Sequence, residues 1–305
     1  MPDPAYRGRF APSPTGPLHF GSLLAALASY LDARAHHGTW LIRMEDLDRP
    51  RTVPGAADDI LRTLEAFGLH WDETVLYQSR RAAAYRDVLQ QLIDDQLAYP
   101  CGCTRKQLQT ESETGPEGPI YPGTCRTGLP EGRTARTWRV RISEAPIHFI
   151  DTIQGEQQQS LADICGDFIV RRADRLFAYQ LAVVVDDAEQ RITDVIRGAD
   201  LLLSTGRQCY LQRQLGLVSP RYGHLPVAVN RQGDKLSKQT HAPPLTGETP
   251  TAYLLAALQC LGQALPESGQ DARVEELLTY AVHHWSRERV PARKKISLPI
   301  AGLPG

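Results

Sequence analysis

The sequence predicts an α/β fold built on a doubly wound parallel sheet, because short apolar strands alternate with amphipathic helices along its first hundred residues. Residues 7–12 form one apolar run, ended by proline, and residues 39–46 form a second run with a charged end. Helical spacing of apolar residues follows each run, over 22–37 and then over 54–69. Strand, helix, strand and helix in this order are typical of a parallel sheet with crossover helices.

Start and stop signals support these helices. The first is expected to stop at Gly38, and the second begins at Pro54 with Asp58 and Asp59 in its first turn. Residues 80–97 predict a third helix. Since the helices are long enough to return the chain across a sheet, the opening residues predict βα units.

The α/β rhythm breaks after the third helix and then resumes. Residues 99–135 are rich in Gly, Pro, Thr and Cys without a clear period, and strand-like alternation follows over 137–142 and 148–155. Strand and helix patterns return at 192–198 and 201–216. A polar loop and two helical segments come last, over 233–245, 251–263 and 273–286. We therefore expect four regions: the first half of a Rossmann-type sheet domain over 1–98, an insert over 99–190, the second half of the sheet domain over 191–245, and a small helical C-terminal region over 246–305.

The composition of the chain limits the classes of protein to which it can belong. The 305 residues are 42% hydrophobic and 23% charged, with a formal net charge of −1. The balance of charge predicts no polyanion partner by itself, although a local basic patch could still exist. No apolar run approaches the ~20 residues of a membrane span, and the N-terminal residues contain no apolar signal segment. We therefore expect a cytoplasmic protein without a membrane partner.

The stretch PSPTGPLHFGS, residues 12–22, follows the first predicted strand and opens the first helix. Gly16 and Gly21 allow a ligand to approach the backbone closely, and a helix N-terminus offers N–H groups to phosphate. The imidazole of His19 can donate to phosphate oxygens. A Pro/Gly turn with a helix-capping His is an equally good interpretation of this stretch alone.

The second polar motif is KLSKQ, residues 235–239. Lys235 and Lys238 can wrap a polyphosphate and neutralise charge on a pyrophosphate leaving group. Taken alone, a solvated loop is the better interpretation, because short lysine runs lie mostly on surfaces.

Three of the six cysteines predict a metal site. Cys101 and Cys103 are one residue apart, and Cys125 follows in a Gly/Pro-rich loop. Closely spaced thiolates suit a closed tetrahedral zinc site, whereas three reduced thiols in a loop are the alternative. The other three lie inside apolar patterns and are expected in the core: Cys165, Cys209 and Cys260.

Together the two phosphate motifs resemble the HIGH and KMSKS signatures of class I aminoacyl-tRNA synthetases. The glutamyl-type branch is matched in order by RFAPSPTGPLHFGS, RMEDLD, YQSRR, FAYQLAVVVDD, VIRGADLL, HLPVAVN and KLSKQ, over nearly the whole chain to about residue 260. Only residues 240–305 follow KLSKQ, which leaves no room for a large anticodon-binding domain. The chain therefore looks most similar to the glutamyl-Q tRNA(Asp) synthetase family, a shortened relative of glutamyl-tRNA synthetase.

The resemblance implies three sets of site residues. ATP would bind at Pro12, Gly16, His19, Gly21, Ser22 and Lys238, with His19, Lys235 and Lys238 as catalytic residues. Glutamate would bind at Arg9, Phe10, Ala11, Pro12, Ser13, Glu45, Tyr179 and Arg197. In that pocket Glu45 would pair with the ammonium, Arg9 and Arg197 would hold carboxylates, and Tyr179 would donate a hydrogen bond. One structural zinc ion would be held by Cys101, Cys103, Tyr121 and Cys125. Asp46, Asp48 and Asp186 are expected to support the site rather than to catalyse.

The resemblance also implies a two-step reaction. Glutamate would be activated with ATP and Mg²⁺, without RNA, to glutamyl-adenylate, and the glutamate would then pass to the queuosine at the wobble position of tRNA(Asp). We expect a monomer.

Three alternatives stay open. They are a truncated glutamyl-tRNA synthetase that charges the 3′ end of tRNA(Glu), a non-catalytic zinc-stabilised RNA- or amino-acid-binding paralogue, and a small-molecule nucleotidyltransferase. Intact His19 and both lysines count against a non-catalytic paralogue. The basic tail could contact RNA, but a solvated helix end is favoured there; its residues are Arg287, Arg289, Arg293, Lys294 and Lys295.

Overall fold

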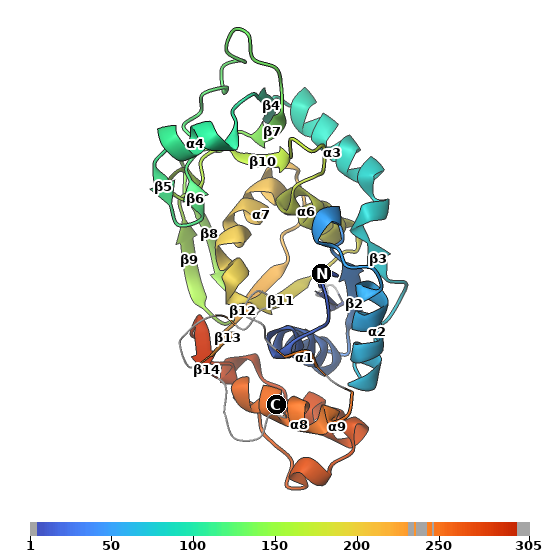
Figure 1. Cartoon of the computed structure of the whole chain (residues 1–305). Helices are drawn as coiled ribbons and strands as arrows, with labels where there is room; N and C mark the ends of the chain where they lie inside the picture. The colour runs from blue at the N-terminus through green and yellow to red at the C-terminus, as the bar shows by residue number, and fades with distance from the viewer. Residues whose placement is uncertain (1–4, 231–234, 236–242, 246, 298–305) are drawn as a thin grey trace.

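The central feature of the computed structural model is a twisted parallel sheet with helices on both faces (Figure 1). The structure describes residues 5–230, 235, 243–245 and 247–297. The backbone N–H of Thr193 donates to the carbonyl of Arg7 at 2.9 Å, which places the strand that starts at Asp194 beside the first strand. The order across the sheet is β3 (Leu76–Tyr77), β2 (Thr39–Met44), β1 (Arg7–Phe10), β11 (Asp194–Gly198) and β12 (Arg221–Leu225).

Two hydrophobic cores cover the two faces of the sheet, as the doubly wound prediction requires. Trp40 and Ile42 of β2 pack into one core, whereas Leu41 packs into the other, because successive side chains of a strand point to opposite faces. The first core contains α1 (Phe20–Ala35), α2 (Ala56–Ala66), α8 (Pro250–Cys260) and α9 (Val274–His284). The second contains α3 (Ala82–Asp94), α6 (Tyr179–Glu189) and α7 (Leu202–Gln214).

The predicted strand over 148–155 is two strands. β8 (Ile147–Asp151) and β9 (Gly155–Gln159) pair antiparallel, and Gly155 closes the turn at a φ of +76°, which glycine adopts readily. β9 reads GEQQQ and contains no apolar residue, so no alternation of hydrophobicity marks it as a second strand. β8 also pairs with β12 in parallel at Tyr222 and Asp151, which extends the sheet.

The insert lies at the top of Figure 1 and is built on an antiparallel sheet. Its strands are β4 (Ala98–Cys101), β7 (Thr137–Val140) and β10 (Phe168–Arg171), in the order β10, β7, β4. The residues without a clear period contain short elements, which are too brief to show one. They are α4 (Arg105–Glu111), β5 (Thr114–Gly115) and β6 (Gly118–Pro119), and α5 (Leu161–Ile164) follows β9.

The C-terminal region packs its helices against α1 and then returns to the sheet domain. β14 (Lys295–Ser297) pairs in parallel with β13 (Val227–Val229). The interpretation of the tail as a solvated helix end is wrong for Arg287, whereas Arg289, Arg293, Lys294 and Lys295 are exposed as expected. Arg287 is largely buried and its guanidinium bonds Asp32 and Asp194, each at 2.6 Å. Single 3₁₀ turns complete the description: Arg49–Arg51, Gln78–Arg80, Ala199–Leu201, Gly269–Asp271 and Arg287–Arg289.

Among the described residues, none of the helices has the length and apolar character needed to cross a membrane. Of the three cysteines expected in the core, Cys209 and Cys260 are buried, and Cys165 is partly exposed.

Candidate functional site

The candidate site lies at the carboxyl ends of β1 and β11, where the order of strands in the sheet reverses. Ligands of open α/β sheets bind at such a point, because the crossovers before and after it diverge to opposite faces. Phe10 ends β1, and the segment after it is tied to the segment after β2 by a hydrogen bond from Glu45 N–H to the carbonyl of Pro12, at 2.9 Å. Arg197 lies near the end of β11, and Tyr179 begins α6.

His19 caps the N-terminus of α1. Its Nδ1 accepts a hydrogen bond from the backbone N–H of Ser22 at 3.3 Å. An imidazole whose Nδ1 accepts carries its proton on Nε2, so the other side of the ring is a donor. The turn interpretation and the phosphate interpretation are thus compatible, because the cap orients the ring while Nε2–H can serve a ligand.

Two adjoining cavities, of about 170 and 450 Å³, share His19, Ser22, Asp200 and Lys235 in their walls. Gly21 lines the smaller cavity only. The larger one is also lined by Phe10, Ala11, Pro12, Ser13, Thr15 and Leu18. The structure therefore brings the first-strand segment, the start of α1 and Lys235 together around one crevice.

Lys235 is the one residue of KLSKQ that the structure describes, and Lys238 lies outside the described residues. The Nζ of Lys235 contacts a carboxylate oxygen of Asp200 at 2.6 Å. Asp200 was not predicted from the sequence; its carboxylate holds Lys235 at the wall of the crevice.

Gly16, in the segment after β1, has a φ of +133°, in the region that glycine favours.

Arg9 and Arg43 share one buried carboxylate, that of Asp187 at the end of α6. The Nε of Arg9 donates to Asp187 at 3.1 Å, and an outer nitrogen of Arg43 lies 2.7 Å from the same oxygen. Burial would raise the pKa of Asp187, but the two guanidiniums hold it below its usual value. Asp187 is therefore an anion that fixes both arginines.

Glu45 offers an oxygen without a partner. Its Oε1 is buried and accepts no hydrogen bond from the described residues, and the nearest cation is the Nε of Arg43 at 3.8 Å. Burial raises the pKa of Glu45 to about 7, although Arg43 and Arg9 oppose the rise. A buried acceptor of this kind is costly unless a ligand donates to it.

Arg197 is buried at 4% exposure and is held by uncharged acceptors only. Its outer nitrogen donates to Thr205 Oγ1 and Gln208 Oε1, each at 2.8 Å. Its Nε donates to His224 Nε2 at 3.0 Å, and its remaining nitrogen lies 3.4 Å from the Tyr179 hydroxyl. No carboxylate among the described residues lies within ion-pair distance of it.

Arg197 contacts a buried imidazole, that of His224, which in turn contacts the buried carboxylate of Asp151. His224 Nδ1 lies 2.5 Å from Asp151, and both side chains have no solvent exposure. Burial lowers the pKa of His224 to about 4, although Asp151 opposes the shift. The neutral ring donates through Nδ1–H to Asp151 and accepts from Arg197 through Nε2, so its tautomer is fixed from both sides.

The three acidic residues expected to support the site are engaged in structural contacts. Asp46 accepts from the backbone N–H and hydroxyl of Ser79, at 2.7 and 2.6 Å. Asp186 accepts from Gln78, Arg81 and Tyr85, and Asp48 pairs with Arg51. These contacts agree with the prediction that none of the three is a catalyst.

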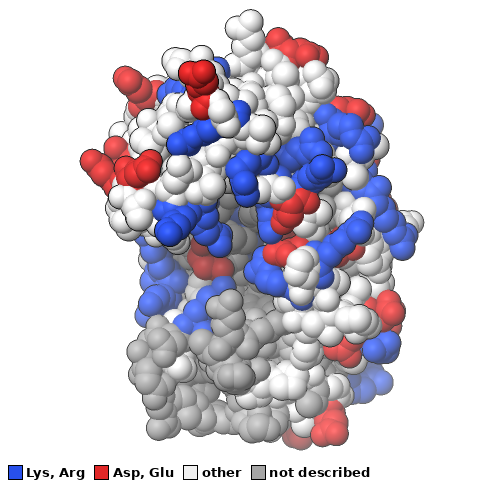
Figure 2. All heavy atoms as spheres, turned by 45° about the horizontal axis from the view of Figure 1, so that its top comes forward, with Lys and Arg blue, Asp and Glu red and all other residues white. Residues whose placement is uncertain are grey.

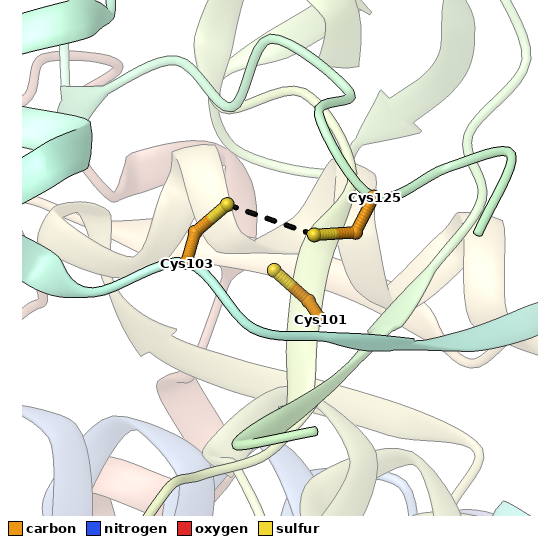
Figure 3. A group of neighbouring side chains, drawn as sticks. All are labelled: Cys101, Cys103 and Cys125. Atoms are coloured by element: carbon orange, nitrogen blue, oxygen red, sulfur yellow. Dashed lines mark hydrogen bonds between the residues drawn. The ribbon is translucent and has the colours of Figure 1, made fainter. Parts of the chain in front are cut away.

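The three cysteines predicted to bind a metal meet in the insert (Figure 3). The sulfurs of Cys101, Cys103 and Cys125 all lie within 4.8 Å of one another, and all three residues are buried. Cys103 and Cys125 have their sulfurs 3.7 Å apart, close to the ~3.8 Å that tetrahedral geometry and Zn–S bonds of ~2.3 Å give. The cluster thus fits a metal site.

Tyr121 lies beside this cluster, as the resemblance implies. Its hydroxyl oxygen is 3.4 Å from the Cys101 sulfur and accepts from the backbone N–H of Cys125 at 2.8 Å. Burial opposes ionisation of Cys101, but the hydrogen bonds from Tyr121 and Arg139 bring its pKa down to about 7. Three cysteine sulfurs are ordinary zinc ligands, and the Tyr121 oxygen beside them would be an uncommon fourth donor.

Sequence reasoning missed Arg43, Asp151, Asp187, Asp200 and His224. Each stands inside a segment already matched to the synthetase pattern or directly after a strand, so position was a usable signal. Their roles depend on contacts between residues up to 178 positions apart, as between Arg9 and Asp187, and no local pattern encodes such contacts.

Comparisons with known proteins show the family to which the chain belongs. Residues 5–247 match a family model described as tRNA synthetases class I (E and Q), catalytic domain. The chain is 55% identical over 296 residues to glutamyl-Q tRNA(Asp) synthetase of Dechloromonas aromatica, covering 96% of this chain and 98% of that protein. It is 54% identical over 301 residues to the protein of that name in Chromobacterium violaceum, covering 99% and 100%.

Among solved structures, the fold is similar to a glutamate tRNA ligase from Elizabethkingia meningosepticum in complex with its amino acid. The TM-score is 0.80 at 24% identity, over 97% of this chain and 67% of that one. Glutamate-tRNA synthetase from Elizabethkingia anophelis gives 0.81 at 24% identity, over 97% and 68%. These likenesses confirm the predicted class I synthetase fold.

The buried His224 predicts an acid-sensitive contribution to stability. The folded pKa of about 4 lies below the usual 6.5, so between these pH values only the unfolded chain binds the proton, and stability decreases as the pH is lowered. Glu45, with its pKa raised to about 7, acts in the opposite direction over nearly the same window. The difference in the free energy of unfolding between the wild-type protein and His224→Asn isolates the contribution of the histidine. In urea unfolding, the stability advantage of wild type should shrink by about 2 kcal/mol from pH 6.5 to 4.5.

The exposed His148 supplies the control, since His148→Asn should leave the difference constant across the same pH range. A constant difference for His224→Asn as well would contradict the neutral, buried imidazole.

Proposed function

The chain belongs to the glutamyl-Q tRNA(Asp) synthetase family of class I synthetases, and from this premise we propose that it activates glutamate with ATP in the absence of RNA and transfers it to queuosine in tRNA(Asp). The observation that carries the proposal is the charge balance of the buried cluster beside the crevice. Three guanidiniums, those of Arg9, Arg43 and Arg197, accompany the ionised carboxylate of Asp187 and the carboxyl group of Glu45, whose pKa is raised to about 7, so positive charge is in excess.

A free amino acid with a second carboxylate complements this cluster. Glutamate carries two carboxylates and one ammonium, so its net charge of about −1 offsets the excess guanidinium. The ammonium can donate to the unsatisfied Oε1 of Glu45, and a carboxylate can supply the counter-charge that Arg197 lacks. Tyr179 can add a hydrogen bond from its hydroxyl. Arg9, which is held in position by Asp187, would bind the second carboxylate of glutamate.

ATP would occupy the two adjoining cavities. Pro12, Gly16, Gly21 and Ser22 would form the part of the ATP site that surrounds the start of α1, and Nε2–H of His19 would donate to phosphate. Lys235, from the opposite wall, would neutralise charge on the phosphates. Lys238 is assigned the same role from the sequence, and Mg²⁺ would arrive with ATP.

The proposed first step is in-line attack of the glutamate α-carboxylate on the α-phosphorus of ATP. An oxygen–phosphorus bond forms to give glutamyl-adenylate, and the bond to the β-phosphate oxygen breaks to release pyrophosphate. No protein nucleophile is needed, since positioning and electrostatic stabilisation suffice. In the second step, a hydroxyl of the queuosine cyclopentenediol attacks the activated carbonyl and AMP leaves.

The buried cysteine cluster and Tyr121 would hold one structural zinc ion. The ion would tie the end of β4 to the loop that contains Tyr121 and Cys125, because its ligands come from both. The four regions expected from the sequence remain the proposed domain division, with this cluster inside the insert.

Glutamate-dependent ATP–pyrophosphate exchange tests the first step. The wild-type protein should catalyse exchange with no RNA present. Lys235→Ala should lower the exchange rate about 10²-fold, because it removes a charge that stabilises the leaving pyrophosphate. Lys106→Ala, an exposed lysine on α4, is the matched control and should retain full exchange.

Exchange that appears only with tRNA(Glu) would replace the proposal by a truncated glutamyl-tRNA synthetase. A protein inactive under every condition would favour the non-catalytic paralogue.

The metal assignment predicts about one zinc per chain by elemental analysis. Cys103→Ser should lose the metal and lower the Tm, since one of the ligands is gone. Cys260→Ser is the control: it changes a buried cysteine in α8, outside the cluster, and should keep the metal. If elemental analysis finds no zinc in the wild-type protein, or equal amounts in both variants, the zinc assignment is wrong.

A further inference from the structure

A groove of about 430 Å³ in the insert has an unusual concentration of arginines. One wall is the start of β7 and the residues before it, and the other is the turn that follows β10. Its lining residues are Thr134, Ala135, Arg136, Trp138, Arg171, Arg172, Ala173 and Arg175. We call it the arginine groove.

Most of this positive charge is not neutralised by carboxylates of the residues that the structure describes. Among the described residues, no carboxylate lies within ion-pair distance of Arg136, Arg171 or Arg175. Only Arg172 has such partners, Asp174 at 2.7 Å and Asp48 at 3.6 Å. A chain whose net charge is −1 thus gathers unpaired cations in one place, which favours an anionic partner.

The arginine groove adjoins the proposed catalytic site. Asp48, which Arg172 contacts, lies three residues after Glu45 in the segment that leaves β2. The insert comes toward the viewer in Figure 2, where Lys and Arg side chains gather around a hollow in this face. A ligand in the groove would therefore lie beside the segment that carries Asp48 and Glu45.

Trp138 adds a feature that a simple phosphate site would not need. Its side chain is half-buried between the arginines and leaves part of the ring available in the groove. Arginines that follow a backbone, together with an aromatic ring on which a base can stack, are the features of single-stranded nucleic-acid sites.

We propose that the arginine groove binds the phosphate backbone of the substrate RNA, with an unpaired loop base against Trp138. The inference rests on the proposed function, because it names where the RNA substrate of that reaction is held. It explains how a loop of RNA can be gripped by the insert beside the site that makes the adenylate.

Binding of queuosine-containing tRNA(Asp), measured by fluorescence anisotropy at several salt concentrations, tests this surface. The variant Arg136→Gln/Arg175→Gln removes two exposed, unpaired guanidiniums. It should weaken binding at least about 10-fold and reduce the salt slope by about 1.5, since each lost phosphate contact accounts for 0.7–0.9. Pyrophosphate exchange without RNA should stay at the wild-type rate, and the melting temperature should be unchanged.

The matched control is Arg62→Gln/Arg273→Gln, which removes two exposed arginines from α2 and from the N-terminus of α9. Its affinity and salt slope should equal those of wild type. Equal losses in both double variants, or no loss in either, would overturn the groove assignment. Trp138→Ala should weaken binding without altering the salt slope, and a slope change there would contradict stacking.

If wild-type protein exchanges pyrophosphate but transfers no glutamate to this tRNA, the proposed acceptor fails. A wild-type transfer rate retained by Arg136→Gln/Arg175→Gln overturns the groove alone. Tight binding of an acidic protein, with no RNA binding, would replace RNA by a protein partner.

Discussion

The buried guanidinium of Arg197 is the constraint on which the rest of the site depends. It is surrounded by acceptors that carry no charge, whereas Arg9 and Arg43 have Asp187. Removing an ion from water is expensive unless a counter-charge meets it, so the pocket is incomplete without an anionic ligand. His224 maintains this state, because a neutral ring that accepts from Arg197 brings no counter-charge with it, and Asp151 holds the ring in the required tautomer.

The sheet places this pocket next to the two adjoining cavities that His19 and Lys235 line. β1 and β11 are neighbours although almost 190 residues separate their starts, and their carboxyl ends deliver the first-strand segment and Arg197 to the same edge. The helix cap at His19 then sets the imidazole at the entrance of α1. Activation of a carboxylate by ATP needs these two ligands side by side, and the topological switch point supplies that proximity.

Much of this was predictable from the sequence, for reasons that individual elements make clear. Apolar periodicity identified the alternation of β1, α1, β2 and α2, and the spacing of Cys101, Cys103 and Cys125 identified their cluster. Long-range partners were not predictable, because nothing near Arg9 indicates Asp187 and nothing in the tail indicates that Arg287 bonds Asp32. The second strand of the β8–β9 hairpin was missed because β9 consists of Gly, Glu and Gln and shows no alternation of hydrophobicity. The arginine groove arises where β7 and β10 pair, although its two walls are distant in sequence.

Calorimetric binding of L-glutamate and L-glutamine to the wild-type protein, without ATP or RNA, tests the charge balance of the pocket most directly. The two ligands have nearly the same shape and differ in one carboxylate. The account predicts measurable binding of glutamate and at least about 100-fold weaker binding of glutamine, because the amide leaves the excess guanidinium charge buried and unpaired. Equal affinities would contradict the claim that an uncompensated guanidinium selects the ligand.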